Sequence, residues 1–306
     1  MKATRLQLLL GFLCIYTLWG STYLAIRIGV STIPPFVMGG IRFIIAGSLL
    51  FGWGRWRGGV KPDREQWKNA AIIGVLLLVI GNGAVAWSEQ RVDSGVASLL
   101  VATVPLWIVL GEMVQGRRPA LLQWIGVAVG LFGVAILVMP SKGSSTQPID
   151  RMGAAALMFG SLSWTIGSLF SRTARLATPS SMASGMQMLC AGVMMSFVSV
   201  ASGEWARLDV ASISTSSILA LGYLIVFGSI IGFSTYMWLL GVARPAAVGT
   251  YAYVNPLVAV FLGVVVAGEK LPASATLAMI VIVTSVALVS LAPYLKKPSV
   301  PPAEVV

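Results

Sequence analysis

Residues 81–106 read GNGAVAWSEQRVDSGVASLLVATVPL, and residues 232–257 read GFSTYMWLLGVARPAAVGTYAYVNPL. Four residues recur between these two stretches at a constant separation of 151 positions: Gly81 and Gly232, Trp87 and Trp238, Pro105 and Pro256, and Leu106 and Leu257. Each stretch lies at the same place within its own series of five hydrophobic segments. The chain therefore carries one pattern twice, and the second copy begins about 150 residues after the first.

The composition places both copies in a membrane. Apolar residues make up 57% of the chain and charged residues 10%, with a mean hydropathy of +0.88, whereas roughly a quarter of a soluble domain is charged. A membrane crossing takes about 20 apolar residues and is helical, because lipid offers no hydrogen bonds to an open backbone. We expect ten such helices, at residues 7–28, 35–54, 69–90, 95–115, 121–140, 152–172, 180–202, 214–242, 246–267 and 273–294.

The predicted fold is an all-α membrane protein with ten transmembrane helices, arranged as two inverted five-helix repeats around a central cavity. Since each copy holds an odd number of crossings, the second must be inverted relative to the first. We place the first repeat at residues 1–140, the second at 150–294 and a disordered, proline-containing cytoplasmic tail at 295–306. Inverted repeats with binding at their interface are typical of secondary transporters.

The net charge of +11 does not indicate nucleic-acid binding, because the basic residues follow the predicted topology. With the N-terminus in the cytoplasm, fourteen lysines and arginines fall on the inner side and six on the outer side. This asymmetry follows the positive-inside rule, so we expect both termini in the cytoplasm. The expected partners are a lipid bilayer and a small-molecule substrate, with no nucleic acid.

Residues suited to catalysis or metal binding are scarce. The chain has no histidine, and Cys14 and Cys190 fall inside predicted helices, where a cysteine is usually a small buried side chain. We therefore expect no catalytic residue, no metal site and no cofactor. An enzyme would need a convergent nucleophile and base. An ion channel would need rings of like charge or a carbonyl filter.

Charged residues inside the predicted helices are few and therefore informative. Arg42 lies near the middle of the second helix, where it either pairs with carbonyl groups in a structural role or contacts a substrate carboxylate. Glu112 lies near the cytoplasmic end of the fourth helix, and we interpret it as a partner of Arg117 or Arg118. The first and sixth helices contain no acidic residue.

Helix breakers occur in matched pairs. Pro105 and Pro256 each remove a backbone donor at an equivalent depth and favour a kink. We predict that these prolines act in gating, with simple packing kinks as the alternative. Gly81 and Gly232 loosen the third and eighth helices or allow close helix packing.

Aromatic residues at mid-depth suggest a binding site. Tryptophans near helix ends are explained by interfacial belts, but Trp19, Trp107 and Trp164 lie far from both ends of their helices. Helical spacing places polar side chains on the same helix faces as aromatic ones. An apolar cavity with a few hydrogen-bonding groups is the usual composition of a small-molecule site, and a plain core is the alternative for each residue. The predicted substrate-binding residues are Trp19, Tyr23, Arg42, Asn82, Trp107, Trp164, Ser168, Tyr251 and Asn255.

Several of these segments resemble a known family. The residues concerned are WGST at 19–22, Arg42, SGVASLLVATVP at 94–105 and TYAYVNPLVAVFLGVVVAGE at 250–269. They look like the EamA-type repeats of the drug/metabolite transporter superfamily, and the likeness covers about residues 8–292. It implies that helices one to four and six to nine surround a central cavity, with helices five and ten as buttresses.

The resemblance also implies a multi-pass exporter in a bacterial inner membrane. Its substrates would be amino acids, aromatic or other apolar ones and threonine among them, or related metabolites, moved by alternating access. Exporters of drugs or of other metabolites such as nucleobases are the alternative within the superfamily. Small four-helix members carry a membrane-embedded glutamate in their first helix, and this chain has none there, so we expect flux without proton coupling. The oligomeric state stays open, a monomer included.

Overall fold

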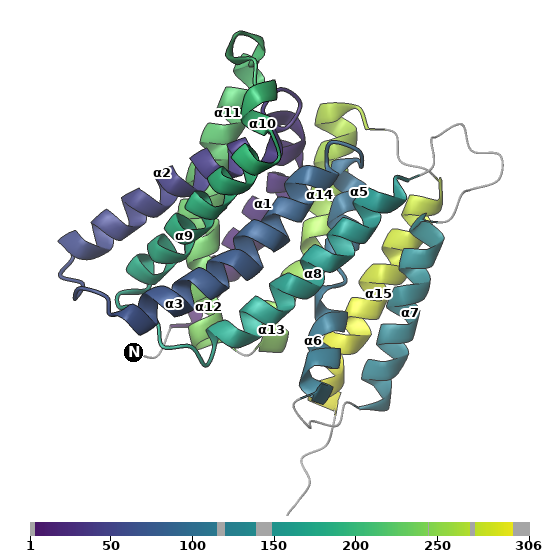
Figure 1. The fold of residues 1–306 in the computed structure, drawn as a ribbon. Helices are drawn as coiled ribbons and strands as arrows, with labels where there is room; N and C mark the ends of the chain where they lie inside the picture. Colours follow the sequence, from purple (N-terminus) through teal and green to yellow (C-terminus); the bar gives the residue numbers. More distant parts are fainter. Residues whose placement is uncertain (1–3, 115–119, 139–148, 244, 270–272, 296–306) are drawn as a thin grey trace, which may run out of the picture.

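The structure, a computed structural model, describes residues 4–114, 120–138, 149–243, 245–269 and 273–295, and its regular elements there are all helices (Figure 1). The elements of the first half are α1 Arg5–Gly29, α2 Pro35–Trp56, α3 Arg64–Ile73, η1 Gly74–Asn82, α4 Gly83–Ser88, α5 Ser94–Val101, α6 Val104–Val114 and α7 Leu121–Val138. Those of the second half are α8 Arg151–Ser171, α9 Ser180–Ala201, α10 Glu204–Arg207, η2 Val210–Ser212, α11 Thr215–Tyr223, η3 Leu224–Phe233, α12 Ser234–Val242, α13 Pro245–Val248, α14 Tyr251–Ala267 and α15 Ala273–Leu295.

Local sequence signals begin several helices. Before α1, the Thr4 hydroxyl accepts from the Gln7 amide at 3.2 Å, and the Gln7 side chain accepts from the Thr4 amide at 2.9 Å. Asp63 and Gln66 form the same reciprocal cap before α3, at 2.8 and 3.0 Å. These caps satisfy N–H groups that a helix start leaves without an intrahelical partner.

The outside of the helix bundle is apolar, as a lipid environment requires. Leu9, Phe197 and Phe261 are 66%, 74% and 63% exposed. Seven described helical segments are long and apolar enough to cross a membrane. The other three predicted crossings correspond to shorter apolar stretches, at Leu121–Ile136, Val254–Ala267 and Ser274–Ser285.

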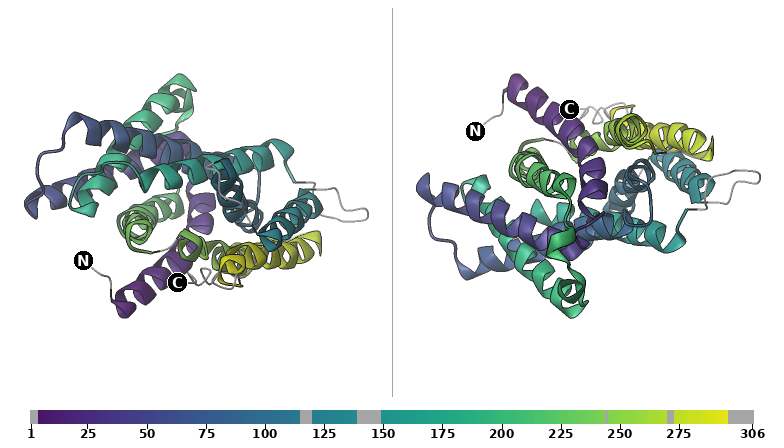
Figure 2. Two further views of the ribbon diagram at one scale, coloured as in Figure 1. Left: turned by 90° about the horizontal axis from the view of Figure 1, so that it is seen from below. Right: turned by 90° about the horizontal axis from the view of Figure 1, so that it is seen from above.

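Two helix pairs frame the bundle (Figures 1 and 2). In one, α2 packs against α9, and a Cβ built on Gly185 would lie 2.5 Å from the amide nitrogen of Phe51. Only glycine permits such a close approach of two backbones. In the other, α7 packs against α15 at one edge of the bundle, where the Ser285 hydroxyl donates to the Gly126 carbonyl at 2.7 Å.

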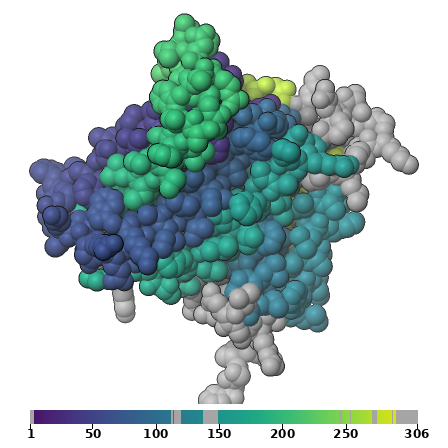
Figure 3. Space-filling view, viewed as in Figure 1, coloured from purple at the N-terminus to yellow at the C-terminus, as the bar shows by residue number. Residues whose placement is uncertain are grey.

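The two halves interlock. Helix α1 of the first half packs against α14, α11 and η3 of the second, and α8 of the second half packs against η1, α4, α5 and α6 of the first. Figure 3 shows α3, α8 and α9 side by side on one face, with the segment around α10 projecting from one end of the bundle. The surface between the halves therefore runs through the centre of the molecule.

Irregular helix occurs at matching places in the two halves. The π-helical segments η1 and η3 end at Asn82 and Phe233, which are 151 positions apart. The matched prolines, in contrast, behave differently. Helix α5 ends at Val101, the residue whose carbonyl Pro105 leaves without a donor, whereas Pro256 lies inside the continuous helix α14.

Some predictions fall outside the described residues. Beyond Leu295, the tail predicted to be disordered lies outside them, and so do Arg117 and Arg118. Glu112 belongs to α6, but its side chain also lies outside the described part of the structure.

Candidate functional site

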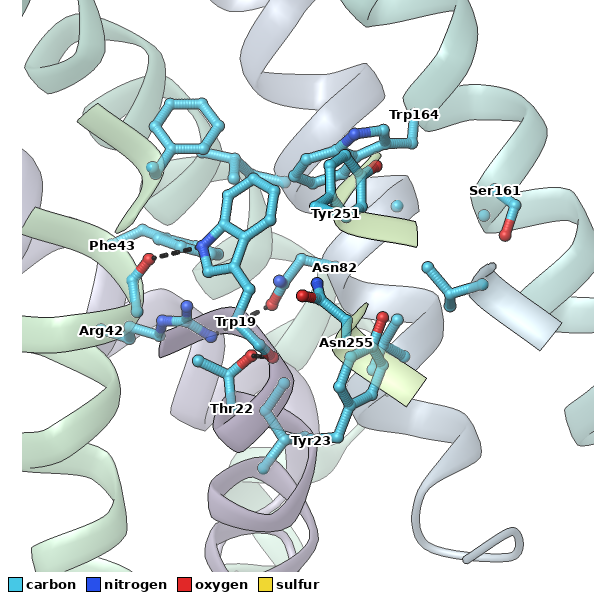
Figure 4. A pocket seen from close by; sticks show the side chains of 18 residues that line it. Trp19, Thr22, Tyr23, Arg42, Phe43, Asn82, Ser161, Trp164, Tyr251 and Asn255 are labelled. Atoms are coloured by element: carbon cyan, nitrogen blue, oxygen red, sulfur yellow. Dashed lines mark hydrogen bonds between the residues drawn. The ribbon is translucent and has the colours of Figure 1, made fainter. Parts of the chain in front are cut away.

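A central cavity of about 670 Å³ lies between the two halves. Its walls come from α1, α2, η1, α4 and α5 of the first half and from α8, η3 and α14 of the second. None of the described residues of α7 or α15 lines it. Figure 4 shows the side chains of Arg42, Asn82 and Asn255 converging on this cavity beside the indole ring of Trp19.

Four aromatic rings, which we call the aromatic cluster, close one end of the cavity. The ring centroid of Trp19 lies 5.5 Å from that of Trp164, 4.8 Å from that of Tyr236 and 5.4 Å from that of Tyr251. The Tyr236 hydroxyl accepts from Trp164 Nε1 at 3.0 Å and hydrogen-bonds with Ser168 Oγ at 2.8 Å. Tyr251 lines both the central cavity and a second cavity of about 330 Å³. The aromatic cluster therefore separates the two cavities.

Each half places a tryptophan against a glycine of the other half. Trp19 of α1 lies over Gly232 of η3, where a Cβ would come 2.6 Å from Trp19 Nε1. Trp164 of α8 lies over Gly81 of η1, where a Cβ would come 3.0 Å from the Trp164 ring. Trp19 Nε1 also donates to the Gly228 carbonyl at 3.3 Å. These contacts couple each tryptophan-bearing helix to the π-helical segment of the opposite half.

Arg42 lies on the cavity wall among neutral groups, with only 4% of its surface exposed. Its Nε donates to Ser229 Oγ at 2.8 Å, and its Nη1 donates to Asn82 Oδ1 at 3.2 Å. The guanidinium carbon lies 4.9 Å from the centroid of the Phe43 ring. Among the described residues, no carboxylate forms a salt bridge with Arg42. Burying a cation without a counter-ion costs several kcal/mol, so the burial of this arginine calls for a functional explanation.

Seven of the nine residues predicted to bind substrate line the central cavity: Trp19, Tyr23, Arg42, Asn82, Trp164, Tyr251 and Asn255. The other two lie elsewhere. Ser168 is one turn beyond Trp164 in α8, on the second cavity behind the aromatic cluster. Trp107 lines neither cavity, although Val104 and Ile108 of the same helix α6 line the second one.

Sequence reasoning missed Tyr236, which joins the aromatic cluster and links Trp164 to Ser168. A signal was present, because Tyr236 lies four residues after Gly232 and therefore on the same helical face. Asn255, one of the predicted residues, has its amide nitrogen placed to donate to the carbonyls of Tyr251 at 3.2 Å and Tyr16 at 3.1 Å.

The end of the bundle predicted to face outside is held by two carboxylates that cap helices across the halves. Glu269, after α14, accepts from the Ser94 amide at 3.0 Å and the Ser94 hydroxyl at 2.7 Å, at the start of α5. Glu204, in α10, accepts from the amides of Phe36 at 2.9 Å and Val37 at 3.0 Å, at the start of α2. A negative charge at a helix N-terminus is favourable because the free amides and the helix dipole point at it. Burial nevertheless raises the pKa of the Glu204 carboxyl.

Glu89, between α4 and α5, was also missed. It is fully buried, and neither carboxyl oxygen has a hydrogen-bond partner among the described residues. Burial raises the pKa of this carboxyl well above its usual value, and nearby Glu269 adds to the rise. Arg27 opposes it and forms a salt bridge with Asp93 at 3.2 Å. No group of three potential metal ligands occurs in the described part of the chain.

Known proteins share both the repeat and the fold. The model of the EamA-like transporter family matches twice, at residues 6–139 and 151–291. The uncharacterized inner membrane transporter YedA of Escherichia coli K12 is 43% identical over 307 residues, covering 99% of this chain and 97% of YedA. The uncharacterized transporter YoaV of Bacillus subtilis is 25% identical, over 84% of this chain and 87% of YoaV.

A solved crystal structure has the same fold. It superposes with a TM-score of 0.67 at 23% sequence identity, covering 94% of this chain and 98% of the other. At that level of identity the likeness extends to the fold alone.

Proposed function

Because the chain belongs to the EamA-like transporter family, we propose that it exports amino acids or closely related small metabolites from the cytoplasm by alternating access. Family membership makes it a multi-pass inner-membrane transporter and not an enzyme. Aromatic and other apolar amino acids and threonine are the first candidates. Nucleobases and drugs are the alternative substrates.

The observation that carries this proposal is the central cavity between the two halves. It is lined by residues of both halves, and small-molecule sites are concave, mostly apolar and carry a few polar groups. Trp19, Trp164 and Tyr251 offer ring faces, and Arg42 and the two asparagines offer hydrogen bonds. Apolar walls with a few polar groups suit an amino acid with an apolar or aromatic side chain.

The direct test is transport by the purified full-length protein in liposomes. Vesicles loaded with unlabelled amino acid should accumulate the same labelled amino acid by exchange, and protein-free vesicles should not. Trp164→Ala should reduce this exchange about tenfold, because it removes a cavity wall and an aromatic contact worth about 0.5–1.5 kcal/mol. The matched control is Trp124→Ala in α7, where the ring is 40% exposed and lies off the cavity; it should leave exchange unchanged.

A screen of all amino acids, nucleobases and cationic drugs in the same vesicles decides between the substrate classes. Exchange of nucleobases or drugs without any amino acid would contradict the proposal. Equal losses of exchange in Trp164→Ala and Trp124→Ala would show that the central cavity is not part of the transport route.

We place both termini in the cytoplasm, on the strength of the fourteen-to-six distribution of basic residues. Reporter fusions after Lys61 and after Arg118 should give cytoplasmic signals. A periplasmic signal at either position would overturn this topology.

For gating, we assign the two prolines to opposite sides of the cavity. Val101 and Asn255, close to Pro105 and Pro256, line its wall, so bending at either proline would change its width. Pro256→Ala restores a backbone donor and should slow exchange more than it weakens binding.

Coupling to protons is not needed in this scheme, because no acidic residue lines the cavity. Exchange should persist after a protonophore dissipates the proton gradient. Loss of exchange under that treatment, reproduced by Glu112→Gln or Glu89→Gln, would instead identify a proton-driven exporter.

A further inference from the structure

We propose that Arg42 and Asn82 form a carboxylate-binding site, so that the transporter selects its substrates by a carboxylate group and not by an ammonium group. This inference rests on the proposed function and extends it, because it states which charged group of a zwitterion is recognised. It predicts that a deaminated acid is accepted and a decarboxylated amine is rejected.

The first argument concerns unused donors. A guanidinium has five N–H groups in a planar fork that matches a carboxylate. In Arg42, one donates to Ser229 and one to Asn82, and the others have no acceptor among the described residues. A Cβ at Gly228 would come 2.8 Å from Nη2, so the glycine makes room for this part of the fork.

The second argument concerns charge. No described carboxylate pairs with Arg42, and no acidic residue lines the cavity. The guanidinium is buried, so its attraction for an anion is only weakly screened by water. A substrate carboxylate would supply the missing counter-ion and occupy the free donors together, in a charge-assisted pair.

The third argument concerns what an ammonium group would meet. Asn82 Oδ1 already accepts from Arg42, and the Asn255 nitrogen is placed to donate to backbone carbonyls. The remaining partners are neutral: the Asn255 oxygen, the ring faces of the aromatic cluster and the hydroxyl groups of Thr22, Tyr23, Ser161 and Tyr251. Neutral acceptors and ring faces attract a cation more weakly than a carboxylate does. An ammonium group is therefore tolerated without being required.

Three compounds with one common ring separate the two charged groups: L-phenylalanine, 3-phenylpropionate without the ammonium, and 2-phenylethylamine without the carboxylate. Binding to the purified full-length protein is measured by calorimetry, independently of transport. We expect 3-phenylpropionate to bind within about tenfold of phenylalanine and 2-phenylethylamine at least about tenfold more weakly than either. Equal or tighter binding of the amine would overturn the inference.

Two variants test the residues. Arg42→Gln removes the charge and should weaken 3-phenylpropionate about ten- to hundredfold, whereas Arg42→Lys should recover part of the loss. Asn82→Asp places a carboxylate of almost identical shape beside Arg42 and should compete with the substrate anion while the helix packing stays intact. Gln123→Glu in α7 is its matched control, because the Gln123 side-chain oxygen accepts from the Ala120 amide at 2.8 Å away from the cavity and a glutamate keeps that bond.

The outcomes distinguish this inference from the proposed function. If no amino acid is exchanged in liposomes but the acid still binds better than the amine, the proposed function fails and the carboxylate site stands. If amino acids are exchanged and Asn82→Asp binds 3-phenylpropionate as tightly as the wild type, the carboxylate site fails alone. Correct folding of every variant is checked by its melting temperature and elution volume.

Discussion

Arg42 in α2 and Gln187 in α9 occupy the same place in the two halves, yet their surroundings differ. They are 145 positions apart, and the same separation relates Trp19 to Trp164, Gly40 to Gly185 and Gly47 to Gly192. Arg42 lines the cavity and has two polar partners. Gln187 is fully buried, and its amide has no hydrogen-bond partner among the described residues.

The partners explain the difference. Ser229 and Asn82 accept from Arg42, and the residues 151 positions away from them are Leu78 and Phe233, which carry no polar side-chain atom. The repeat therefore preserves the helix packing of both halves and supplies hydrogen bonds to only one of them.

Two single variants, each with one of these residues replaced by methionine, should differ most strongly in their rates of exchange. Arg42→Met should lower exchange about ten- to hundredfold, since it removes charge-assisted hydrogen bonds to the substrate, and Gln187→Met should stay within about twofold of the wild type. Initial exchange rates in liposomes are the measurement. Equal losses in the two variants would break the comparison.

The same pair of variants separates a structural arginine from a functional one. Removing a buried, uncompensated cation leaves the melting temperature of Arg42→Met in detergent equal to or above that of the wild type. A fall of ten degrees or so would assign Arg42 to structural pairing, the alternative that the sequence left open.

Glu89 adds a third buried polar group to the comparison. Its raised pKa means that the folded protein keeps a proton that the unfolded chain releases above about pH 4.5. The stabilising contribution is complete below that pH and is lost as the pH rises toward the folded pKa, by up to about 1.4 kcal/mol per pH unit. Melting temperatures should therefore fall between pH 5 and pH 8.

Glu89→Gln should flatten this dependence and melt higher than the wild type at pH 8. A smaller slope should remain, because burial also raises the pKa values of Asp93 and Glu204. An unchanged slope in Glu89→Gln would show that this carboxyl is already ionised in the folded protein.

Alanine variants of the two glycines that pack against Trp19 and Trp164 should differ in melting temperature by a smaller amount. A Cβ at Gly232 would meet Trp19 at 2.6 Å, and one at Gly81 would meet Trp164 at 3.0 Å. Overpacking of this kind costs about 1–3 kcal/mol, so Gly232→Ala should lower the melting temperature more than Gly81→Ala does. The reverse order would mean that the structure around Trp19 accommodates the added methyl group more easily than the structure around Trp164.

The smallest effect is a gain in stability. Gln187→Met replaces an unpaired buried amide by an apolar side chain of similar volume and should stabilise the protein by about 1 kcal/mol, or a few degrees of melting temperature. A loss of stability would indicate that the Gln187 amide has a partner, such as a bound water.

The sequence predicted the features that depend on local pattern. The repeat and the helical fold follow from residue spacing and hydropathy. Pro105 marks the place where the fourth predicted helix divides, since a proline leaves the carbonyl of Val101 without a donor.

Features that depend on contacts between the halves could not be predicted in this way. Glu89 lies at the end of a predicted helix and gives no sign of full burial, which depends on how the two repeats pack. Ser168 shares a helical face with Trp164, yet Tyr236 from another helix separates it from the central cavity. Pro256 matches Pro105 in sequence, but α14 continues through it.

The wide helical turns of η1 and η3 belong to the repeated pattern itself. They end at Asn82 and Phe233, which are 151 positions apart. Arg42 and Gln187 occupy equivalent positions with different side chains, so this difference is specific to each half. A substitution at one of these positions can therefore change the polarity of one half without altering the irregular backbone that both halves share.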